Sequence, residues 1–271
     1  MAEENKRFDM VAATDVGRVR AHNEDSIAAD PDIGVATLAD GMGGYNAGEV
    51  ASGIAVAMIP AEMRKLRAEL DIDKASDSEI EKRVEEQARK VNAAIFNAAQ
   101  KDSQYAGMGT TLVFACWHRD KVTVGHLGDS RMYRLRADSM EPLTRDHSWI
   151  QEQIDSGILT EEQARTSKKK NLITRACGID LNVVPEVHTH LTEPGDIFLL
   201  CSDGLYGMVP DEDICLTVSS LKANLALAAQ QLIQQANDNG GRDNISVILV
   251  HVLQGHSEKS GFFAKLKSWF K

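Results

Sequence analysis

The chain has 271 residues, of which 43% are hydrophobic and 26% charged, a composition ordinary for a soluble globular protein of one large or two small domains. Its formal net charge of −10 argues against nucleic-acid binding through a broad basic surface, because an acidic protein repels phosphate backbones. Segment 1–7 is too polar for a signal peptide, and no run approaches the ~20 apolar residues that span a bilayer, so we expect a cytoplasmic protein.

The first predicted elements are a strand over residues 8–14 and a polar turn over 15–26. The turn contains two arginines and a carboxylate pair: Arg18, Arg20, Glu24 and Asp25. Two interpretations stay open for this turn. It is either a charged hairpin, or a basic group and acids that face the same place as Asp40 on the following strand.

The following strand, residues 34–39, ends at Asp40 and leads into three glycines within four residues, Gly41, Gly43 and Gly44. Glycine has no Cβ and tolerates positive φ, so the backbone here can approach an ion or a phosphate closely. Most Asp-Gly pairs are plain turns, so this pair alone does not identify a site. Its weight comes from the recurrence of the same pattern downstream.

The middle of the chain combines two helices with a β-rich stretch. Helices are predicted over 46–70, with a kink or break at Pro60, and over 77–100, where apolar residues recur every three or four positions. Short strands follow, over 110–117, 121–127 and 131–135, and Asp129 lies in the turn between the last two. Residues 145–175 are predicted to form a helix and a surface loop. Their basic run, Lys168 to Lys170, either receives an anionic substrate or is a solvated face.

The last third repeats the pattern of an apolar strand followed by an aspartate. Strands are predicted over 183–191 and 197–201, and the second leads into Ser202-Asp203-Gly204. A helix over 221–236, a glycine-rich turn containing Asp243 and a strand over 245–253 complete the domain. Clusters of strands separated by pairs of helices predict an α+β fold.

Carboxylates therefore recur at strand-end turns, at Asp40, Asp129, Asp203 and Asp243, with Glu24-Asp25 as a further position. Clustered carboxylates repel one another and raise one another's pKa, a cost that a divalent cation removes. Ligand sets made only of oxygen favour Mg²⁺ or Mn²⁺ over zinc. The sequence lacks the G-x-S-x-G, P-loop and H-E-x-x-H motifs, which leaves oxygen-ligated metal chemistry with Arg20 available for a bidentate phosphate contact.

Six segments in order resemble the motif series of the metal-dependent (type 2C, PPM) Ser/Thr protein phosphatases, and most closely the compact bacterial members. They are residues 19–26, 39–44, 109–111, 128–131, 202–205 and 241–244. Each motif is weak alone, but their order over roughly residues 8–252 is specific. The resemblance implies a four-layer α-β-β-α sandwich with two antiparallel sheets, helices outside and a dinuclear metal site at one edge.

The resemblance also implies roles for individual residues. Asp40 would bridge two Mg²⁺ or Mn²⁺ ions, the Gly41 carbonyl would bind one of them, and Asp203 and Asp243 would complete the sphere of the second. Glu24 and Asp25 would hold metal-bound waters, Asp129 with Asp203 would hold a weaker third ion, and Arg20 would bind phosphate. A hydroxide bridging the two ions would attack phosphorus directly. Residues 147–173 match the variable flap beside the site.

One departure from the family pattern concerns the general acid. Many members have a histidine in or just after the D-G-x-G-G turn, where this chain has Met42 and Tyr45. A metal-bound water or Tyr45 could protonate the leaving group instead, or the enzyme is slow on alkyl phosphates. We expect relatively good turnover of aryl phosphates, whose leaving group needs less help.

The expected function is hydrolysis of phosphoserine and phosphothreonine on proteins, by a monomer that opposes a bacterial Ser/Thr kinase. The alternative is a catalytically weak relative that binds phosphoproteins as a regulator. The phosphatase domain is expected over residues 1–253, followed by a basic-aromatic tail over 254–271. On a helix the tail's apolar residues, from Phe262 to Phe270, would share one face. They would pack on the domain, or dock on a partner or at the inner membrane.

Overall fold

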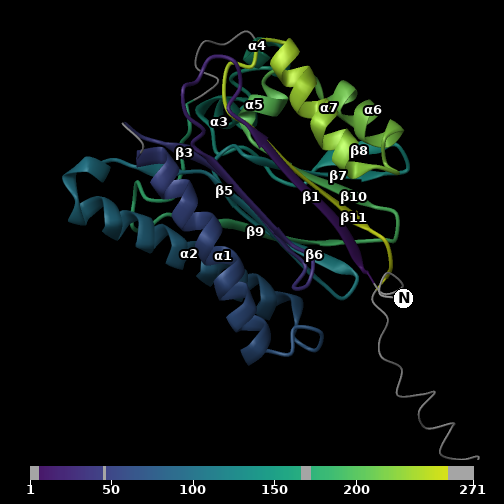
Figure 1. Cartoon of the computed structure of the whole chain (residues 1–271). Coiled ribbons are helices and arrows are strands. Elements are labelled where there is room, and N and C mark those ends of the chain that lie inside the picture. Colours follow the sequence, from purple (N-terminus) through teal and green to yellow (C-terminus); the bar gives the residue numbers. More distant parts are fainter. Residues whose placement is uncertain (1–5, 45–46, 166–171, 256–271) are drawn as a thin grey trace, which may run out of the picture.

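A computed structural model describes residues 6–44, 47–165 and 172–255 (Figure 1). The predictions for Tyr45, for the lysine run 168–170 and for the tail from residue 256 onward lie outside the described residues. In the part of the chain that is described, no helix is long and apolar enough to cross a membrane.

Two antiparallel sheets form the centre of the molecule. The order of strands in the first sheet is β1 (Phe8–Asp15), β11 (Ile245–Val252), β10 (Ile197–Cys201), β7 (Arg131–Arg136) and β8 (Ser139–Pro142). The order in the second sheet is β2 (Asp25–Asp30), β3 (Val35–Met42), β5 (Leu112–His118), β6 (Lys121–Leu127) and β9 (Glu186–Leu191), and β4 (Gly109–Thr110) pairs with β3.

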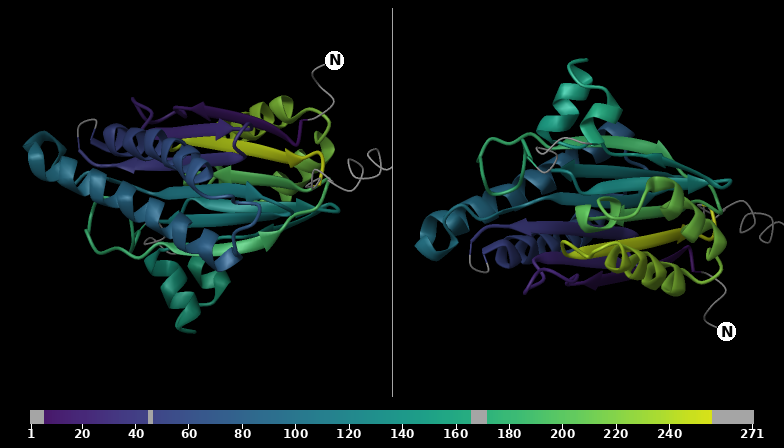
Figure 2. Two further views of the ribbon diagram at one scale, coloured as in Figure 1. Left: turned by 90° about the horizontal axis from the view of Figure 1, so that it is seen from below. Right: turned by 90° about the horizontal axis from the view of Figure 1, so that it is seen from above.

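Helices cover the outer faces of both sheets, which confirms the predicted four-layer α-β-β-α sandwich (Figures 1 and 2). The second sheet is covered by α1 (Ala47–Glu69) and α2 (Asp77–Lys101). The first sheet is covered by α6 (Asp211–Ser220) and α7 (Leu225–Asp238), and the short α5 (Asp203–Tyr206) follows β10. The remaining short helices are η1 (Ser103–Tyr105), α3 (Trp149–Asp155) and α4 (Glu161–Arg165). Helices α3 and α4 project from the side of the sandwich (Figure 2).

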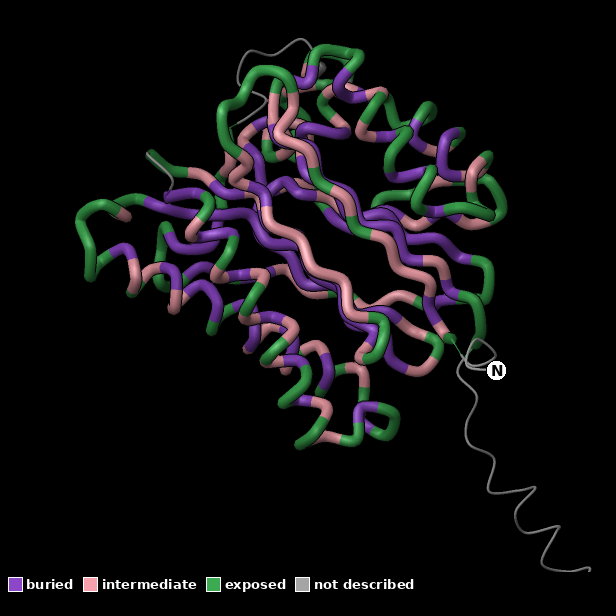
Figure 3. Tube along the Cα trace, viewed as in Figure 1, coloured by how far each residue is buried: buried purple, intermediate pink, exposed green. Residues whose placement is uncertain are grey.

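Strand alternation fills the layer between the sheets. On β3, Ala36 and Leu38 point into the inter-sheet core, while Val35 and Ala39 pack under the helices of the second sheet. Trp117 lies edge-on to Phe198 of the other sheet, with ring centroids 5.5 Å apart. Because both faces of the central strands are covered, buried residues follow one another along them (Figure 3), which explains why these strands read as unbroken apolar runs.

Several details differ from the sequence-based expectations. Strand β2 was not predicted and begins at Asp25, inside the predicted turn. Helix α1 continues through Pro60, because its buried face, including Ile59 and Met63, packs on the core and outweighs one lost backbone hydrogen bond. Strand β9 begins at Glu186, not at residue 183, since Pro185 cannot donate to a ladder. The helix predicted from residue 221 begins at Leu225, where Asn224 caps it, and α6 before it was not predicted.

Candidate metal centre

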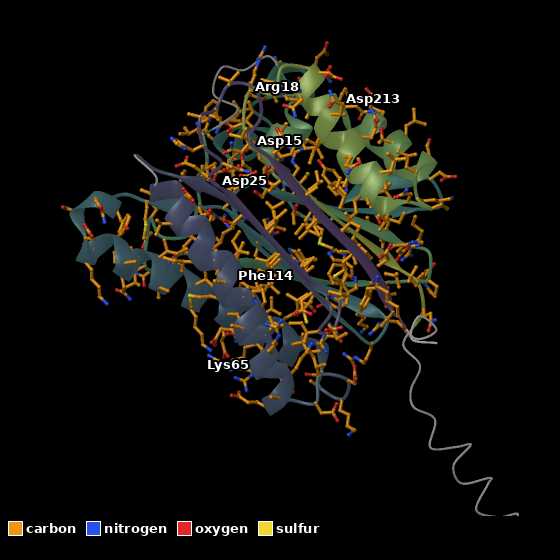
Figure 4. The ribbon with its side chains drawn as sticks, viewed as in Figure 1. Asp15, Arg18, Asp25, Lys65, Phe114 and Asp213 are labelled. Atoms are coloured by element: carbon orange, nitrogen blue, oxygen red, sulfur yellow. The ribbon has the colours of Figure 1, made fainter. Side chains whose placement is uncertain are left out.

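The predicted site residues come together at one end of the inter-sheet layer, where strand-end turns of both sheets meet. Asp25 lies there (Figure 4) and pairs with Asp40 across β2 and β3 of the second sheet. The Ser202 hydroxyl, at the end of β10 in the first sheet, donates to Asp25 Oδ2 at 2.8 Å. A carboxylate of one sheet is thus tied directly to the other.

The backbone of Asp40 is fixed on both sides. Its N–H donates to Thr111 Oγ1 at 2.9 Å, and its carbonyl accepts from Thr110 Oγ1 at 2.9 Å and from Thr111 N at 2.8 Å. Thr111 Oγ1 also lies 2.7 Å from Ser130 Oγ, beside Asp129. These contacts use the backbone of Asp40, so its carboxylate is left to interact with the other acids.

The pKa values show how crowded these acids are. Burial first, and then the charges of neighbouring aspartates, raise the pKa of Asp203 to about 7. Burial likewise raises the pKa of Asp25 and of Asp129 to about 6 in each case. Asp40 has a pKa well above its usual range, because it is buried and faces four other acids: Asp25, Asp203, Asp129 and Asp243. The structure therefore brings all five predicted aspartates together.

The donor chemistry of this cluster fits hard divalent cations. Two buried carboxylate oxygens, Asp25 Oδ1 and Asp203 Oδ1, have no hydrogen-bond partner in the described part of the chain. Unpartnered buried oxygens that belong to mutually repelling carboxylates are destabilising unless positive charge neutralises them. Oxygen ligands of this kind suit Mg²⁺ and Mn²⁺.

Arg20 brings a positive charge into contact with this cluster. Its Nη2 donates to Asp243 Oδ2 at 2.6 Å, and this hydrogen bond is the main cause of the raised pKa of its guanidinium. The Arg20 side chain is 52% exposed, so it lies at the rim, in reach of both the acids and solvent.

Glycines allow the close approach of the turns to one another. A Cβ on Gly41 would lie 2.2 Å from the carbonyl oxygen of Gly48, so no side chain fits there. Its N–H donates to the carbonyl of Glu24 at 3.1 Å. A Cβ on Gly48 would in turn meet the Glu24 carboxylate at 2.9 Å. Glu24 is thus held against the start of α1, beside the aspartates.

Asn244 organises the Arg20 loop, and the sequence reasoning did not assign it a role. Its Nδ2 donates to the carbonyls of Val16 at 3.0 Å and of His22 at 2.9 Å, and its Oδ1 accepts from the N–H of Glu24 at 2.9 Å. One side chain therefore fixes both ends of the loop that contains Arg20. Its place at the end of the 241–244 motif, directly after Asp243, is the signal in the sequence that could have suggested it.

The Asp129 turn lies deeper than the rim. Asp129 is 6% exposed, and Tyr206 Oη on α5 donates to its carbonyl at 2.9 Å. The Arg131 guanidinium stacks over the Tyr206 ring at 3.7 Å and makes two hydrogen bonds to Asp146. This packing next to Asp203 was not predictable from the Gly-Asp-Ser motif alone.

The chain matches the family model described as "Protein phosphatase 2C" over residues 17–249. It is 38% identical over 240 residues to "Serine/threonine phosphatase stp" of Listeria innocua, covering 88% of this chain and 93% of the relative. A solved structure of the Mycobacterium tuberculosis phosphatase PstP/Ppp superposes with a TM-score of 0.82 at 33% identity, covering 91% of this chain and 99% of that one. The catalytic domain of PstP "in complex with 2 Manganese ions" gives a TM-score of 0.79 at 33% identity, with the same coverage.

Proposed function

The chain belongs to the protein phosphatase 2C family, and we propose that it is a metal-dependent phosphatase that removes phosphate from phosphoserine and phosphothreonine of proteins. The observation that supports this most directly is the cluster of five mutually repelling aspartates, two of which have an unpartnered buried oxygen, with an arginine at its rim.

We assign the metal-binding roles by motif position together with this packing. Asp40, the Gly41 carbonyl, Asp203 and Asp243 would hold two Mg²⁺ or Mn²⁺ ions. Glu24 and Asp25 would orient their waters, and Asp129 with Asp203 would hold a weaker third ion. When bound, the ions neutralise phosphoryl charge and lower the pKa of water, which supplies a nucleophile near neutral pH.

Arg20 would orient the phosphoryl group. Asn244 fixes the loop at Val16 and His22, so Arg20 can exchange Asp243 for phosphate by moving its side chain alone. The planar guanidinium suits two phosphoryl oxygens at once. Arg20 therefore contributes orientation and charge stabilisation, and it takes no part in proton transfer.

Protonation of the leaving group is where this chain departs from many relatives. Met42, at the end of β3, has no proton to give, and Tyr45 lies outside the described residues. An aryl phosphate needs less protonation than a phosphothreonine peptide. We expect the ratio of the two activities to favour the aryl substrate.

The class of partner follows from the proposed activity, but no individual partner does. Phosphorylated proteins are the substrates, and a bacterial Ser/Thr kinase is the expected opposing enzyme. We further propose a monomer whose tail, Phe262 to Phe270, docks on a partner or at the inner face of the membrane. This last point is supported only by the aromatic and basic composition of the tail.

The test measures hydrolysis of p-nitrophenyl phosphate and of a phosphothreonine peptide, with Mn²⁺, with Mg²⁺ and with chelator. Metal-dependent turnover of both substrates that is lost in Asp243→Asn supports the phosphatase. If neither substrate is turned over while calorimetry shows that metal binds, the chain is a phosphoprotein-binding regulator instead.

A further inference from the structure

A second cluster of titratable groups lies beside the Asp129 turn. His126, His147 and Glu186 each offer a ligand atom, and these atoms lie within 4.8 Å of one another. None of the three belongs to the motifs that carry the family resemblance. His147 is buried, at the start of the segment 147–173, and Glu186 is the first residue of β9.

The geometry of this cluster is wrong for a metal ion. The rings of His126 and His147 stack at 4.6 Å with only 14° between their planes, so their in-plane lone pairs lie in separate layers. An ion at about 2.1 Å from both nitrogens needs lone pairs that converge. In addition, Arg175 Nη1 lies 3.4 Å from His147 Nε2 and adds positive charge there.

The hydrogen bonds instead make His147 a clamp on Gly128. The N–H of His147 donates to the Gly128 carbonyl at 2.9 Å, and the N–H of Gly128 donates to His147 Nδ1 at 3.2 Å. Gly128 has a φ of +102°, and a Cβ there would meet the Thr111 side chain at 2.7 Å. Both the N–H and the carbonyl of Gly128, the residue before Asp129, are therefore hydrogen-bonded to His147. The backbone of Gly128 has a conformation that favours glycine.

The imidazole of His147 is itself fixed from the other side. Because Nδ1 accepts from Gly128, the ring proton is on Nε2, which faces Glu186 Oε2 at 3.2 Å. Glu186 Oε1 also accepts from His188 Nε2 at 2.8 Å. His126, which stacks on His147, donates from Nε2 to the Arg145 carbonyl at 2.9 Å.

His147 also joins this clamp to the base of the segment 147–173. Its carbonyl accepts from Thr174 N at 2.8 Å, and Trp149 N donates to the Leu172 carbonyl at 2.8 Å. Both ends of the segment therefore meet at His147. This residue is hydrogen-bonded to Gly128, the residue before Asp129. Figure 2 shows that α3 and α4, which lie in this segment, project from the sandwich.

We propose that His147 is a positioning residue for the third cation: by clamping Gly128 it sets the Asp129 carboxylate and ties it to the base of the 147–173 segment. This inference rests on the proposed function, in which Asp129 and Asp203 hold that cation. We expect the third ion to be the weakest of the three, so that its binding depends most on where its carboxylate is held.

The experiment compares His147→Asn with His147→Gln. The Asn Oδ1 can take the place of Nδ1 and accept from Gly128, whereas the Gln amide reaches toward the place of Nε2 and leaves that N–H unpartnered. Mn²⁺ binding is followed by calorimetry and by the electron paramagnetic resonance signal of free Mn²⁺. We expect His147→Gln to bind the third ion about five- to tenfold more weakly, with the two tighter ions unchanged and His147→Asn close to wild type.

Asp129→Asn provides the reference for a lost third ion, and its combination with His147→Gln should weaken binding no further. His190→Gln is the matched control, since His190 Nε2 on β9 has no hydrogen-bond partner in the described structure. Equal effects of Asn and Gln, or equal weakening of all three ions, would reduce His147 to a structural role and overturn the proposal. A wild-type protein that binds two ions but no third also overturns it. One that binds none, without turnover, overturns the proposed function itself.

Discussion

The inter-sheet layer has two regions that differ in chemistry although the same strands build both. Along β3, Ala36 and Leu38 face the apolar core, and the next residue on that face is Asp40. Along β10, Phe198 and Leu200 lead in the same way to Ser202. Strand alternation thus continues from an apolar layer into the acidic centre without any change of direction.

The two regions divide stability and function between them. The apolar region gains free energy by burying side chains such as Leu38 and Trp117, which have almost no exposed surface. The acidic region loses free energy whenever its carboxylates are charged and no cation is bound. A well-packed layer is what allows the fold to carry such a destabilised end. Four changes separate the two contributions.

The largest effect is expected from Asp40→Asn. Activity should fall about a hundredfold or more, because a carboxylate that meets four others is the proposed shared ligand. The melting temperature in chelator should rise, since one of the mutually repelling acids is replaced by a neutral amide. Kinetics and calorimetry of the same preparation measure both quantities.

Asp213→Asn is the matched control for that change, because Asp213 is exposed on α6, away from Asp25 (Figure 4). It should leave both activity and melting temperature close to wild type. A fall in the melting temperature of Asp40→Asn in chelator would mean that this carboxylate stabilises the metal-free fold, against the comparison drawn above.

Leu38→Ala, two residues before Asp40 on the same face of β3, should lower stability and leave activity nearly unchanged. Removing a fully buried leucine costs about 2–5 kcal/mol of unfolding free energy, through lost burial and a cavity. Activity per folded molecule should change far less than stability does. Denaturant titration measures the loss, and Leu216→Ala on α6, whose side chain is 66% exposed, should stay within about 0.5 kcal/mol.

The same division explains what the sequence could predict. Apolar runs that end in Asp-Gly or Gly-Asp predicted both the sheets and the aspartates that meet at their ends. The polar partners were not predictable, because they join residues far apart in the chain. Ser202 and Asp25 are separated by 177 positions, and Asn244 and His22 by 222. Such contacts leave no periodicity in the sequence, and neither does the clamp of His147 on Gly128.

A smaller effect is expected from pH. In chelator, the folded pKa of Asp203, about 7, lies above the unfolded value near 3.9, so the folded state binds more protons between those values. The stability contributed by the protonated group is therefore complete below pH 4 and is lost as pH rises through 7. We expect the melting temperature of the metal-free protein to fall from pH 6.5 to pH 8.

The buried histidines His118 and His126 do not contribute to this fall in melting temperature between pH 6.5 and pH 8. Burial lowers the pKa of His118 and of His126 to about 4, so they destabilise the fold only below the unfolded histidine value of about 6.5. Mn²⁺ should reverse or flatten the trend, because it binds the deprotonated carboxylates. The slope in chelator should decrease in Asp203→Asn. An unchanged slope in that variant would show that other groups cause the pH dependence.

The smallest change, Arg20→Lys, tests whether the arginine at the rim contributes to substrate binding without contributing to the unfolding free energy that the apolar and acidic regions determine. Lysine keeps the charge but loses the planar fork, so we expect KM for p-nitrophenyl phosphate and for the peptide to rise about tenfold. The unfolding free energy should change by less than about 0.5 kcal/mol, because Arg20 is half exposed and its pair with Asp243 is a surface ion pair. Arg18→Lys, two residues earlier on the same exposed loop, is the control and should alter neither quantity.

If Arg20→Lys lowers stability while KM stays constant, then Arg20 serves to neutralise Asp243 in the fold and the phosphate contact must come from another residue. If KM rises and the unfolding free energy stays unchanged, Arg20 acts on the substrate alone. The rim then contributes neither to the stability gained in the apolar layer nor to the repulsion in the acidic region.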